Sequence, residues 1–164
     1  MISEVVIRRP KYDETEIQAF VKVAAKGEEV EAQDIGRGAG RAAALLWIAD
    51  NSGPVAVAAL KTPFESYKIR VFSKAGVSAR HQEFALELGY VYVEKTHRKQ
   101  GLGEKLVQAA IALEGHQNIY ATTRIDNQSM QRILQRNRFL AIGSTYLSER
   151  NGSRLLLFGR HTKF

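Results

Sequence analysis

The chain has 164 residues, enough for one domain, with 45% hydrophobic and 25% charged residues, the balance of an ordinary globular protein. It has no cysteine, which excludes disulfides, cysteine nucleophiles and thiolate metal sites. The net charge of +7 is uneven: residues 1–60 sum to −2, residues 61–99 to +4 and residues 100–164 to +5. This asymmetry favours an anionic ligand or partner, and a basic solvated surface is the alternative interpretation.

The N-terminal stretch MISEVVIRRP has no signal-peptide hydrophobic region. The longest apolar run, Ala42 to Ala49, is far too short to span a membrane. We therefore expect a cytoplasmic protein that does not engage a membrane.

The first part of the chain predicts a short strand at 5–8 and a helix that begins at Asp13. The order D-E-T-E is a capping-box pattern with Glu16 three residues on, and the apolar positions that follow have helical spacing up to Gly27. A weaker helix is expected over 28–35. The segment GRGAGR, residues 36–41, reads mostly as a flexible connection, because no strand precedes it and neither a P-loop nor a dinucleotide fingerprint fits.

A hairpin is predicted next, from two apolar runs around Asn51-Ser52-Gly53-Pro54. Residues 61–82 are basic with interleaved aromatics, and a short helix near 65–75 fits them. The run from Phe84 to Val93 is the most strand-like in the chain, and Gly89 within it suggests a bulge or a close backbone approach. The remaining predicted elements are an amphipathic helix at 102–113, a strand at 119–123, a helix capped by Asp126 or Asn127, and a hairpin of strands 139–146 and 155–158.

The stretch THRKQGLGEKL, residues 96–106, lies between a predicted strand and a predicted helix. The first turn of a helix offers unpaired N–H groups and a partial positive charge, so it favours a phosphate or pyrophosphate. Gly101 and Gly103 let a ligand approach the backbone, while Arg98 and Lys99 add mobile positive charge. The stretch matches neither a P-loop nor G-x-G-x-x-G, but it does match R/Q-x-x-G-x-G/A.

Residues 87–139 resemble the GNAT superfamily of acyl-CoA-dependent N-acetyltransferases. The strand LGYVYV precedes the loop, an amphipathic helix and the strand IYATTR follow it, and Phe139 comes twelve residues after Asn127. The order of elements extends this resemblance over nearly the whole chain. It implies one GNAT-like domain over residues 1–164, with an α/β fold: a mixed, mostly antiparallel twisted sheet flanked by helices, with splayed central strands.

The resemblance also implies acetyl-CoA as acyl donor and places its binding residues. The backbone of Val91, Tyr92 and Val93 would pair with the pantetheine arm and direct an N–H to the thioester carbonyl. The pyrophosphate would be held mainly by main-chain N–H groups of Arg98, Lys99, Gln100, Gly101, Leu102, Gly103 and Glu104. Asn127 would contact the pantetheine or help order the cleft.

Amine attack on a thioester needs a neutral amine, so a general base helps. Glu87 is the first candidate, since the matching strand position carries the glutamate base in histone-type members of the superfamily. A solvent-facing or salt-bridged carboxylate is the alternative for Glu87. Glu83 and His81 are weaker candidates for the base.

The general acid is less defined. Many family members have a tyrosine seven residues after the asparagine, where this chain has Leu134. We take Tyr146 as the candidate that protonates the leaving thiolate instead. The alternatives are Tyr92, Tyr90 or water, or that no acid is needed. Arg138 replaces the usual glycine before Phe139, so the helix end is expected to differ from the common form.

The leading hypothesis is an N-acetyltransferase that moves acetyl from acetyl-CoA to a primary amine by direct attack in a ternary complex. A related enzyme acting on nucleic acid or aminoacyl-tRNA is the second, motivated by the basic segment with Phe64, Tyr67 and Phe72. A CoA-binding domain without turnover is the third. The four histidines lack metal-ligand spacing, so no metal is expected. Homodimerisation is left open.

Overall fold

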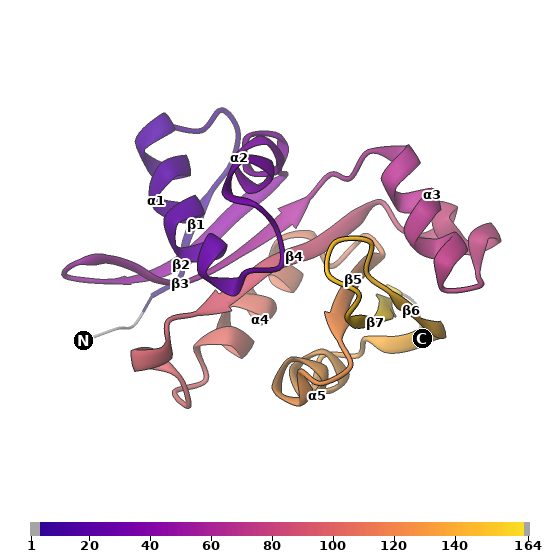
Figure 1. Cartoon of the computed structure of the whole chain (residues 1–164). Coiled ribbons are helices and arrows are strands. Elements are labelled where there is room, and N and C mark those ends of the chain that lie inside the picture. The colour runs from indigo at the N-terminus through magenta and orange to yellow at the C-terminus, as the bar shows by residue number, and fades with distance from the viewer. Residues whose placement is uncertain (1–3, 163–164) are drawn as a thin grey trace. The chain divides into compact units, whose positions relative to one another are not determined.

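The computed structural model describes residues 4–162 (Figure 1). Its strands are β1 (Val6–Arg8), β2 (Ala44–Asp50), β3 (Gly53–Lys61), β4 (Leu86–Val93), β5 (Ile119–Arg124), β6 (Leu140–Leu147) and β7 (Arg154–Arg160). Its α-helices are α1 (Glu14–Ala24), α2 (Ala32–Arg41), α3 (Glu65–Lys74), α4 (Leu102–Glu114) and α5 (Gln128–Arg136). Short 3-10 helices are η1 (Ala25–Gly27), η2 (Ser78–Glu83) and η3 (Lys95–His97).

The strands form a mixed sheet with the order β1-β2-β3-β4-β5-β7-β6. The described pairings β1–β2, β2–β3, β5–β7 and β6–β7 are antiparallel, and β4–β5 is parallel. The predicted mixed, mostly antiparallel sheet flanked by helices is therefore confirmed. The expected splay of the central strands stays a prediction.

The chain forms two compact units, and β4 passes from one into the other. Among the described residues, the first unit comprises 4–62 and 88–114, and the second comprises 63–87 and 115–162. Residues 86 and 87 of β4 thus belong to the second unit and residues 88–93 to the first. Within residues 4–162 no helix has the length and apolar character that crossing a bilayer requires.

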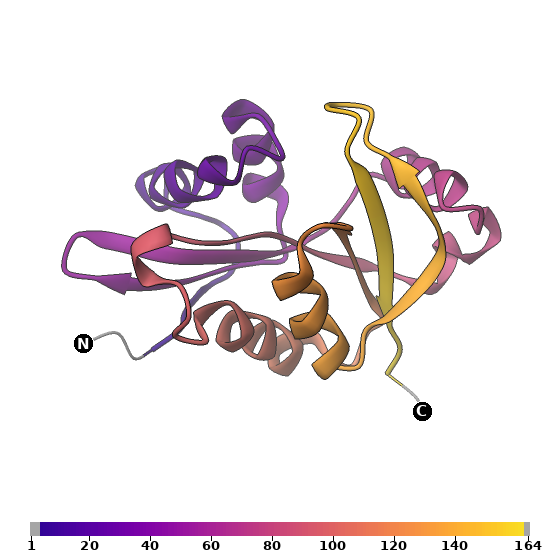
Figure 2. The same ribbon diagram turned by 60° about the horizontal axis from the view of Figure 1, so that its bottom comes forward.

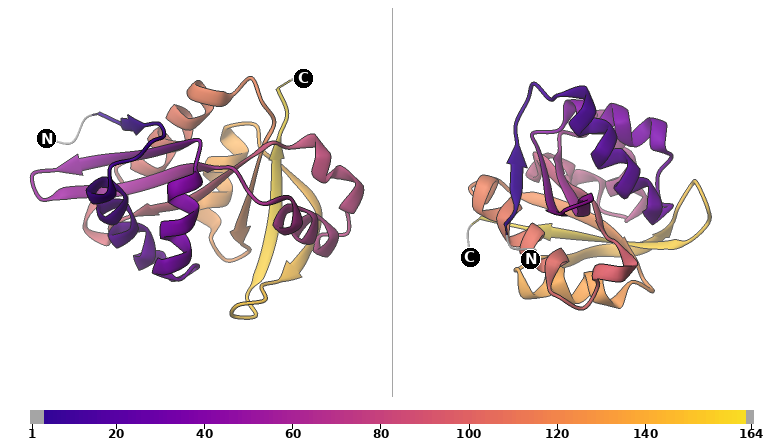
Figure 3. Two further views of the ribbon diagram at one scale, coloured as in Figure 1. Left: turned by 90° about the horizontal axis from the view of Figure 1, so that it is seen from above. Right: turned by 90° about the vertical axis from the view of Figure 1, so that its left-hand side faces the viewer.

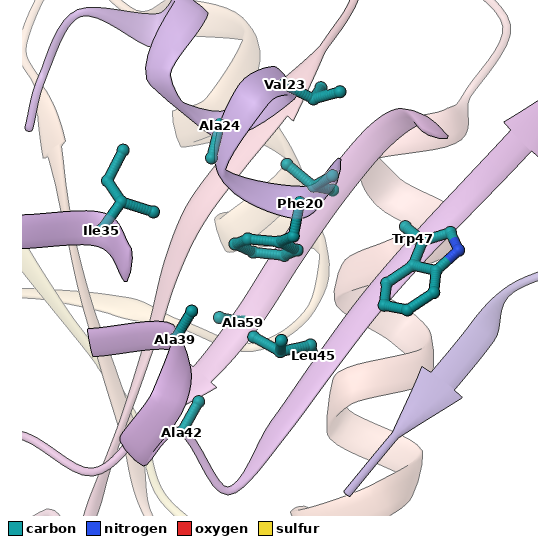
Figure 4. Close-up of a cluster of buried hydrophobic side chains, with 10 residues drawn as sticks. Phe20, Val23, Ala24, Ile35, Ala39, Ala42, Leu45, Trp47 and Ala59 are labelled. Carbon is teal, nitrogen blue, oxygen red and sulfur yellow. The ribbon is translucent and has the colours of Figure 1, made fainter. Parts of the chain in front are cut away.

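In the first unit, α1 and α2 lie on one face of the β2–β3 hairpin and α4 lies on the other (Figure 2). The two helices α1 and α2 run side by side (Figure 3, left). Their apolar faces meet the hairpin in one buried cluster (Figure 4), formed by Phe20, Val23, Ala24, Ile35, Ala39, Ala42, Leu45, Trp47, Val57 and Ala59. Burial of this cluster supplies the hydrophobic stabilisation of the unit.

Helix α1 begins as its sequence predicts, with one difference. Asp13 is the N-cap, and its Oδ1 accepts from the N–H of Thr15 at 2.8 Å. Glu16, the expected second half of the capping box, instead forms an ion pair with Arg8 at 2.8 Å. The cap is therefore Asp13 alone, and Glu16 ties α1 to β1.

The prediction of a flexible connection at residues 36–41 is wrong, because this segment forms the second half of α2. Ile35 and Ala39, four residues apart, are buried together in the core of the unit. A Cβ at Gly38 would lie 2.2 Å from the hydroxyl of Tyr90, so a larger residue here would force the Tyr90 side chain to move. Tertiary packing thus outweighs the low helix propensity of three glycines.

The irregularity expected at Gly89 is present, one residue further on. Tyr90, in the middle of β4, has φ of 56°, which is left-handed for a non-glycine residue. A Cβ on Gly89 would lie 2.6 Å from the Cδ of Lys61. The group that approaches the backbone of Gly89 is therefore the Lys61 side chain. The Lys61 ammonium then lies 4.4 Å from the centroid of the Tyr90 ring.

The second unit contains β5, β7 and β6, with α3 and α5 on opposite sides of the β6–β7 hairpin (Figure 2). Phe72, Phe84 and Tyr120 pack against one another at its centre, with ring centroids 5.2 to 6.3 Å apart. The β6 strand bulges at Gly143, which has φ of 71° and whose Cβ would lie 2.3 Å from the carbonyl of Ala75. The N–H of Ser144 donates to that carbonyl at 2.9 Å, so the bulge fastens β6 to the end of α3.

Neighbouring strands β3 and β4 are joined by a long connection. β3 ends at Lys61 and β4 begins at Leu86, so 24 residues, 62 to 85, lie between them. Connections of two to five residues are usual for adjacent antiparallel strands. Here the connection forms α3 and η2, and α3 covers Tyr120 and Ile142.

Asn127, and not Asp126, caps α5: its Oδ1 accepts from the N–H of Met130 at 3.1 Å. At the other end of α5, the expectation of an unusual helix end is wrong. Arg138 has φ of 71°, its N–H donates to the Gln135 carbonyl, and the Phe139 N–H donates to the Leu134 carbonyl. These are the two bonds of a Schellman motif, so the common helix end forms with arginine where glycine is favoured.

Candidate active site

The predicted pyrophosphate loop leads from η3 into α4 within the first unit. The carbonyl of Gly101 accepts the first helical bond from the Lys105 N–H at 3.0 Å, which makes Gly101 the residue before the helix. The N–H groups of Leu102, Gly103 and Glu104 then belong to the first turn, where an α-helix supplies no carbonyl for them. A first turn of this kind attracts an anion through its N–H groups and its partial positive charge.

The conformation of the loop leaves room for a ligand. Gly101 has φ of 76°, and apart from its chain neighbours no described residue has a heavy atom within 4 Å of the place where its Cβ would be. The glycine is therefore required by its backbone angle, and its open side admits a bulky group. Lys99 also has a positive φ, of 65°, and its side chain is exposed. These features fit the pyrophosphate of CoA.

Arg98 is anchored, which corrects the expectation of a mobile charge. Its Nε donates to the Val93 carbonyl at 3.0 Å, and its guanidinium lies 5.4 Å from the centroid of the Tyr92 ring. The arginine thus ties the start of the loop to the end of β4. Gln100, also in the predicted set, is exposed, whereas Leu102 and Gly103 are buried under the helix. Their contribution to an anion site is through the main chain.

The strand segment Val91 to Val93 is half-buried. Its neighbour Glu94 continues the pairing with β3, donating its N–H to the Val55 carbonyl at 2.8 Å. One lone pair of the Val93 carbonyl is taken by Arg98. The structure therefore places the predicted pantetheine-binding strand and the pyrophosphate loop next to each other in the first unit.

In the second unit, Glu87 is a buried carboxylate. Its side chain is only 3% exposed, which excludes the alternative of a solvent-facing strand residue. In the parallel register Glu87 lies opposite Tyr120, whose Oη lies 3.4 Å from Glu87 Oε1. A carboxylate is one of the side chains that serve as general bases, and Glu87 is the carboxylate that β4 places in this buried surrounding.

Two further tyrosines, Tyr146 and Tyr67, pack in the hydrophobic cluster that contains Tyr120. Tyr146 lies on β6, is 8% exposed and hydrogen-bonds the side chain of Thr122. Burial, and next the nearby charge of Glu87, raise the pKa of Tyr146. Burial, and next the nearby charge of Glu87, likewise raise the pKa of Tyr120, and Tyr67 on α3 packs against the same cluster. The structure therefore brings the predicted base and the predicted acid into one cluster.

The other candidates for proton transfer have different partners. Glu83 accepts from the Arg80 guanidinium at 2.9 and 3.0 Å and lies 2.8 Å from the Nε2 atom of His161. These bonds, that of Arg80 first, lower the pKa of Glu83 from 4.5 to about 2. The Nδ1 atom of His81 lies 3.0 Å from Glu65 Oε1. Neither residue joins the cluster around Glu87.

The residues after β5 have structural roles in addition to any ligand contact. Asn127 is exposed and its side-chain oxygen caps α5, while its amide nitrogen makes no part of the cap. Leu134, at the usual tyrosine position, lies on the buried face of α5 and is fully buried. A leucine side chain has no acidic proton, so this helix position cannot supply the general acid.

Sequence reasoning missed Tyr120, Thr122 and Tyr67 as members of the cluster. Tyr120 and Thr122 lie in the predicted strand IYATTR, but the register of a parallel pair is not encoded in either strand alone. Tyr67 belongs to α3, 20 residues before Glu87 in the sequence. The interleaving of Tyr67 and Phe72 on one predicted helix was the available signal, and it marked packing toward Tyr120.

The sequence matches the model of the Acetyltransferase (GNAT) family over residues 11–139. The chain belongs to this family. The match spans α1 to the end of α5 and so includes the pyrophosphate loop, Glu87 and Asn127. As a GNAT acetyltransferase, the chain uses acetyl-CoA as acyl donor. No curated protein matches the sequence.

Solved structures of this fold resemble the GNAT chain over nearly its whole length. An acyl-CoA N-acyltransferase from Pseudomonas aeruginosa is 17% identical with a TM-score of 0.67, and ElaA from Escherichia coli is 15% identical with a TM-score of 0.71; each match covers 98% of this chain and 100% of the other. A putative acetyltransferase, yncA, from Salmonella typhimurium, solved with acetyl-CoA, is 14% identical with a TM-score of 0.64, covering 99% and 96%. At these identities the likeness confirms the fold.

Proposed function

We propose that this GNAT chain is an N-acetyltransferase that acetylates a primary amine by direct attack in a ternary complex. The observation that carries the proposal is the buried carboxylate of Glu87, with the hydroxyl of Tyr120 at 3.4 Å and Tyr146 nearby. Most primary amines are protonated at neutral pH, so a nucleophilic amine requires a proton acceptor. A carboxylate is one of the side chains that act as a general base, so Glu87 is the group that can accept this proton.

Each residue has one role in this proposal. Bound acetyl-CoA supplies the thioester that is attacked. The main-chain N–H groups of Leu102 to Glu104 hold the pyrophosphate, and an N–H of Val91 to Val93 stabilises the oxyanion. Glu87 takes the proton of the attacking amine, and Tyr146 returns a proton to the leaving thiolate. Because Tyr146 has a raised pKa, it is protonated at neutral pH and available as a donor.

The absence of cysteine supports direct transfer. An acyl-enzyme on a thiolate needs a cysteine, and the sequence contains none. The nitrogen therefore bonds directly to the carbonyl carbon, the C–S bond breaks, and one proton passes to Glu87 while one is given to sulfur. Holding both substrates at once supplies much of the rate advantage.

Action on nucleic acid is the second candidate, and one observation favours it. Within the described residues the second unit has 11 Lys and Arg against 5 Asp and Glu, a surplus of 6 positive charges. Other features count against it: Phe72 is fully buried, Lys68 donates to the Phe84 carbonyl, and Lys74 pairs with Glu149 at 2.8 Å. These residues of the basic segment are thus occupied in packing and pairing, whereas Phe64 is 62% exposed.

A panel of amines with acetyl-CoA tests the function, read out by released CoA thiol and by mass spectrometry of the product. The panel includes small aliphatic amines, amino acids, peptides with free N-termini, lysine peptides and aminoacyl-tRNA. Acetylation of one class supports the proposal. CoA binding by calorimetry with no thiol release from any amine would establish a binding domain without turnover. RNA binding that weakens steeply with salt would favour the second candidate.

A further inference from the structure

The loop that enters α4 is fastened to the β2–β3 hairpin by contacts that precede it. Figure 2 shows η3 beside this hairpin. Glu94, just before η3, donates its N–H to the Val55 carbonyl and accepts from the Lys26 ammonium at 2.6 Å. These bonds hold the chain where it leaves β4. His97, the residue before Arg98, has its own contacts.

Both ring nitrogens of His97 have partners within the first unit. Nε2 lies 3.3 Å from Oδ2 of Asp50, at the end of β2, and Nδ1 lies 2.9 Å from Oγ1 of Thr96. The N–H of His97 donates to the Glu94 carbonyl at 2.9 Å. The His97 side chain is 21% exposed and that of Asp50 is 30% exposed, so water only partly reaches the contact between them.

Asp50 is itself held in one orientation. Its Oδ1 accepts from the N–H of Ser52 at 2.8 Å and from the Ser52 hydroxyl at 2.6 Å. These bonds, and next the proximity of His97, lower the pKa of Asp50. The β2–β3 turn therefore presents a fixed, ionised acceptor to the imidazole.

The loop beyond His97 needs such support. Lys99 and Gly101 both have positive φ, and for lysine this region of backbone space is unfavourable. A residue in such a conformation is retained where the surrounding structure holds it in place. The contacts of His97, two residues before Lys99, are part of that surrounding structure.

We infer that His97 is a positioning residue for CoA: through Asp50 it fixes the pyrophosphate loop on the β2–β3 turn before the ligand arrives. The inference rests on the proposed placement of the pyrophosphate at residues 98–104. His97 has no role in the chemical step in this inference. Its substitution should change only the affinity for CoA. Preorganisation of this kind increases affinity by removing the cost of ordering the loop on binding.

Calorimetric titration with CoA alone tests this on His97→Ala, Asp50→Asn and the double variant. Each single change is expected to weaken CoA binding about five- to tenfold, the net effect of one hydrogen bond. The double variant should bind no more weakly than the weaker single variant, because both changes break the same contact. His97→Gln, whose amide can still donate to Asp50, should regain part of the affinity.

Kinetics separate positioning from general damage. If an acceptor is found, KM for acetyl-CoA should rise by the same factor in His97→Ala, with kcat and the KM of the amine unchanged. His116→Ala, an exposed histidine of the second unit, is the control and should bind CoA as the wild type does. Wild-type CoA affinity in His97→Ala, or additive losses in the double variant, would overturn the inference. Loss of acetyl transfer with CoA binding intact would count against the proposed function alone.

Discussion

Glu87 and Tyr120 are register partners in the parallel pairing of β4 and β5, and the Tyr120 hydroxyl lies 3.4 Å from the Glu87 carboxylate. Both side chains are buried, at 3% and 0% exposure. A carboxylate in this setting is either a structural hydrogen-bond acceptor or a proton acceptor in the reaction. Mutation distinguishes these two roles.

Glu87→Gln keeps the size of the side chain and removes its proton affinity. We expect kcat at neutral pH to fall by about 10²-fold or more, because general base catalysis typically contributes that much. The ascending limb of the pH–rate profile should disappear, while CoA affinity measured by calorimetry stays the same. Glu83→Gln is the matched control, since it removes a nearby carboxylate that pairs with Arg80 and His161. A pH–rate profile of wild-type form in Glu87→Gln would exclude Glu87 as the base.

Tyr146→Phe removes the proposed acid. Burial and the charge of Glu87 keep the pKa of Tyr146 above its ordinary value, so the phenol is protonated throughout the neutral range. We expect kcat to fall by about tenfold or more with unchanged CoA affinity. Tyr12→Phe removes a hydroxyl that donates to the Ala42 carbonyl in the first unit, and it should leave kcat unchanged. Equal kcat in Tyr146→Phe and wild type would exclude Tyr146 as the general acid.

Gly101→Ala tests the loop, and Gly152→Ala controls for backbone strain. The two glycines have φ of 76° and 71°, and each has open space where a Cβ would be. Both changes should cost about 1 kcal/mol or more of stability, because alanine disfavours this region. Only Gly101→Ala should also weaken CoA binding in calorimetry, since its methyl group enters the proposed pyrophosphate site. Equal affinity in both variants would refute this placement of the pyrophosphate.

Arg138→Gly should stabilise the protein by about 0.5–1 kcal/mol, measured by urea unfolding. Arg138 occupies the left-handed position of the Schellman motif, where glycine avoids the steric penalty of a side chain. Arg136→Gly, inside the last turn of α5, should instead destabilise by about 1 kcal/mol. Destabilisation by both changes would mean that the Arg138 side chain contributes more than its backbone costs.

The lowered pKa of Glu83 predicts how the stability of the folded protein changes in acid. Its pKa falls from 4.5 to about 2 on folding, so its contribution to stability is complete above about pH 4.5 and is lost as the pH falls toward 2. We expect Tm of Glu83→Gln to lie below that of the wild type at pH 7, with the two values converging near pH 2. Glu28→Gln, an exposed carboxylate of the first unit, is the control. A gap in Tm that stays constant from pH 7 to pH 2 would contradict this prediction.

Local signals in the sequence were sufficient for most elements. Asp13 and Asn127 cap helices where the pattern predicts helix starts, and Asn51 to Gly53 turn the first hairpin. Such features depend on neighbours within four residues. Periodicity and caps therefore predict the order of elements, and that order with the loop spacing predicts the family.

Features that depend on distant residues were not predictable. From the sequence, the glycines of α2 are interpreted as a connection. The small residue at position 38 leaves room for the hydroxyl of Tyr90, which lies 52 residues later in the sequence. The pairing of Glu87 with Tyr120 depends on strand register, and the anchoring of His97 by Asp50 depends on the reach of a hairpin. In each case tertiary packing decides a choice that local propensity leaves open.

The connection between β3 and β4 limits how far this enzyme can be trimmed or redesigned. A shortened chain that joined β3 and β4 by a tight turn would lack α3, which packs against Tyr120. It would also lack Ala75, whose carbonyl accepts a hydrogen bond from the β6 bulge. Redesign for a new acceptor should therefore keep Phe72 and Ala75 and draw its diversity from the outward positions of α3, such as Ser66 and Ile69. The buried face of α3 is therefore part of the structural core of the second unit, and substitutions should be confined to its exposed face.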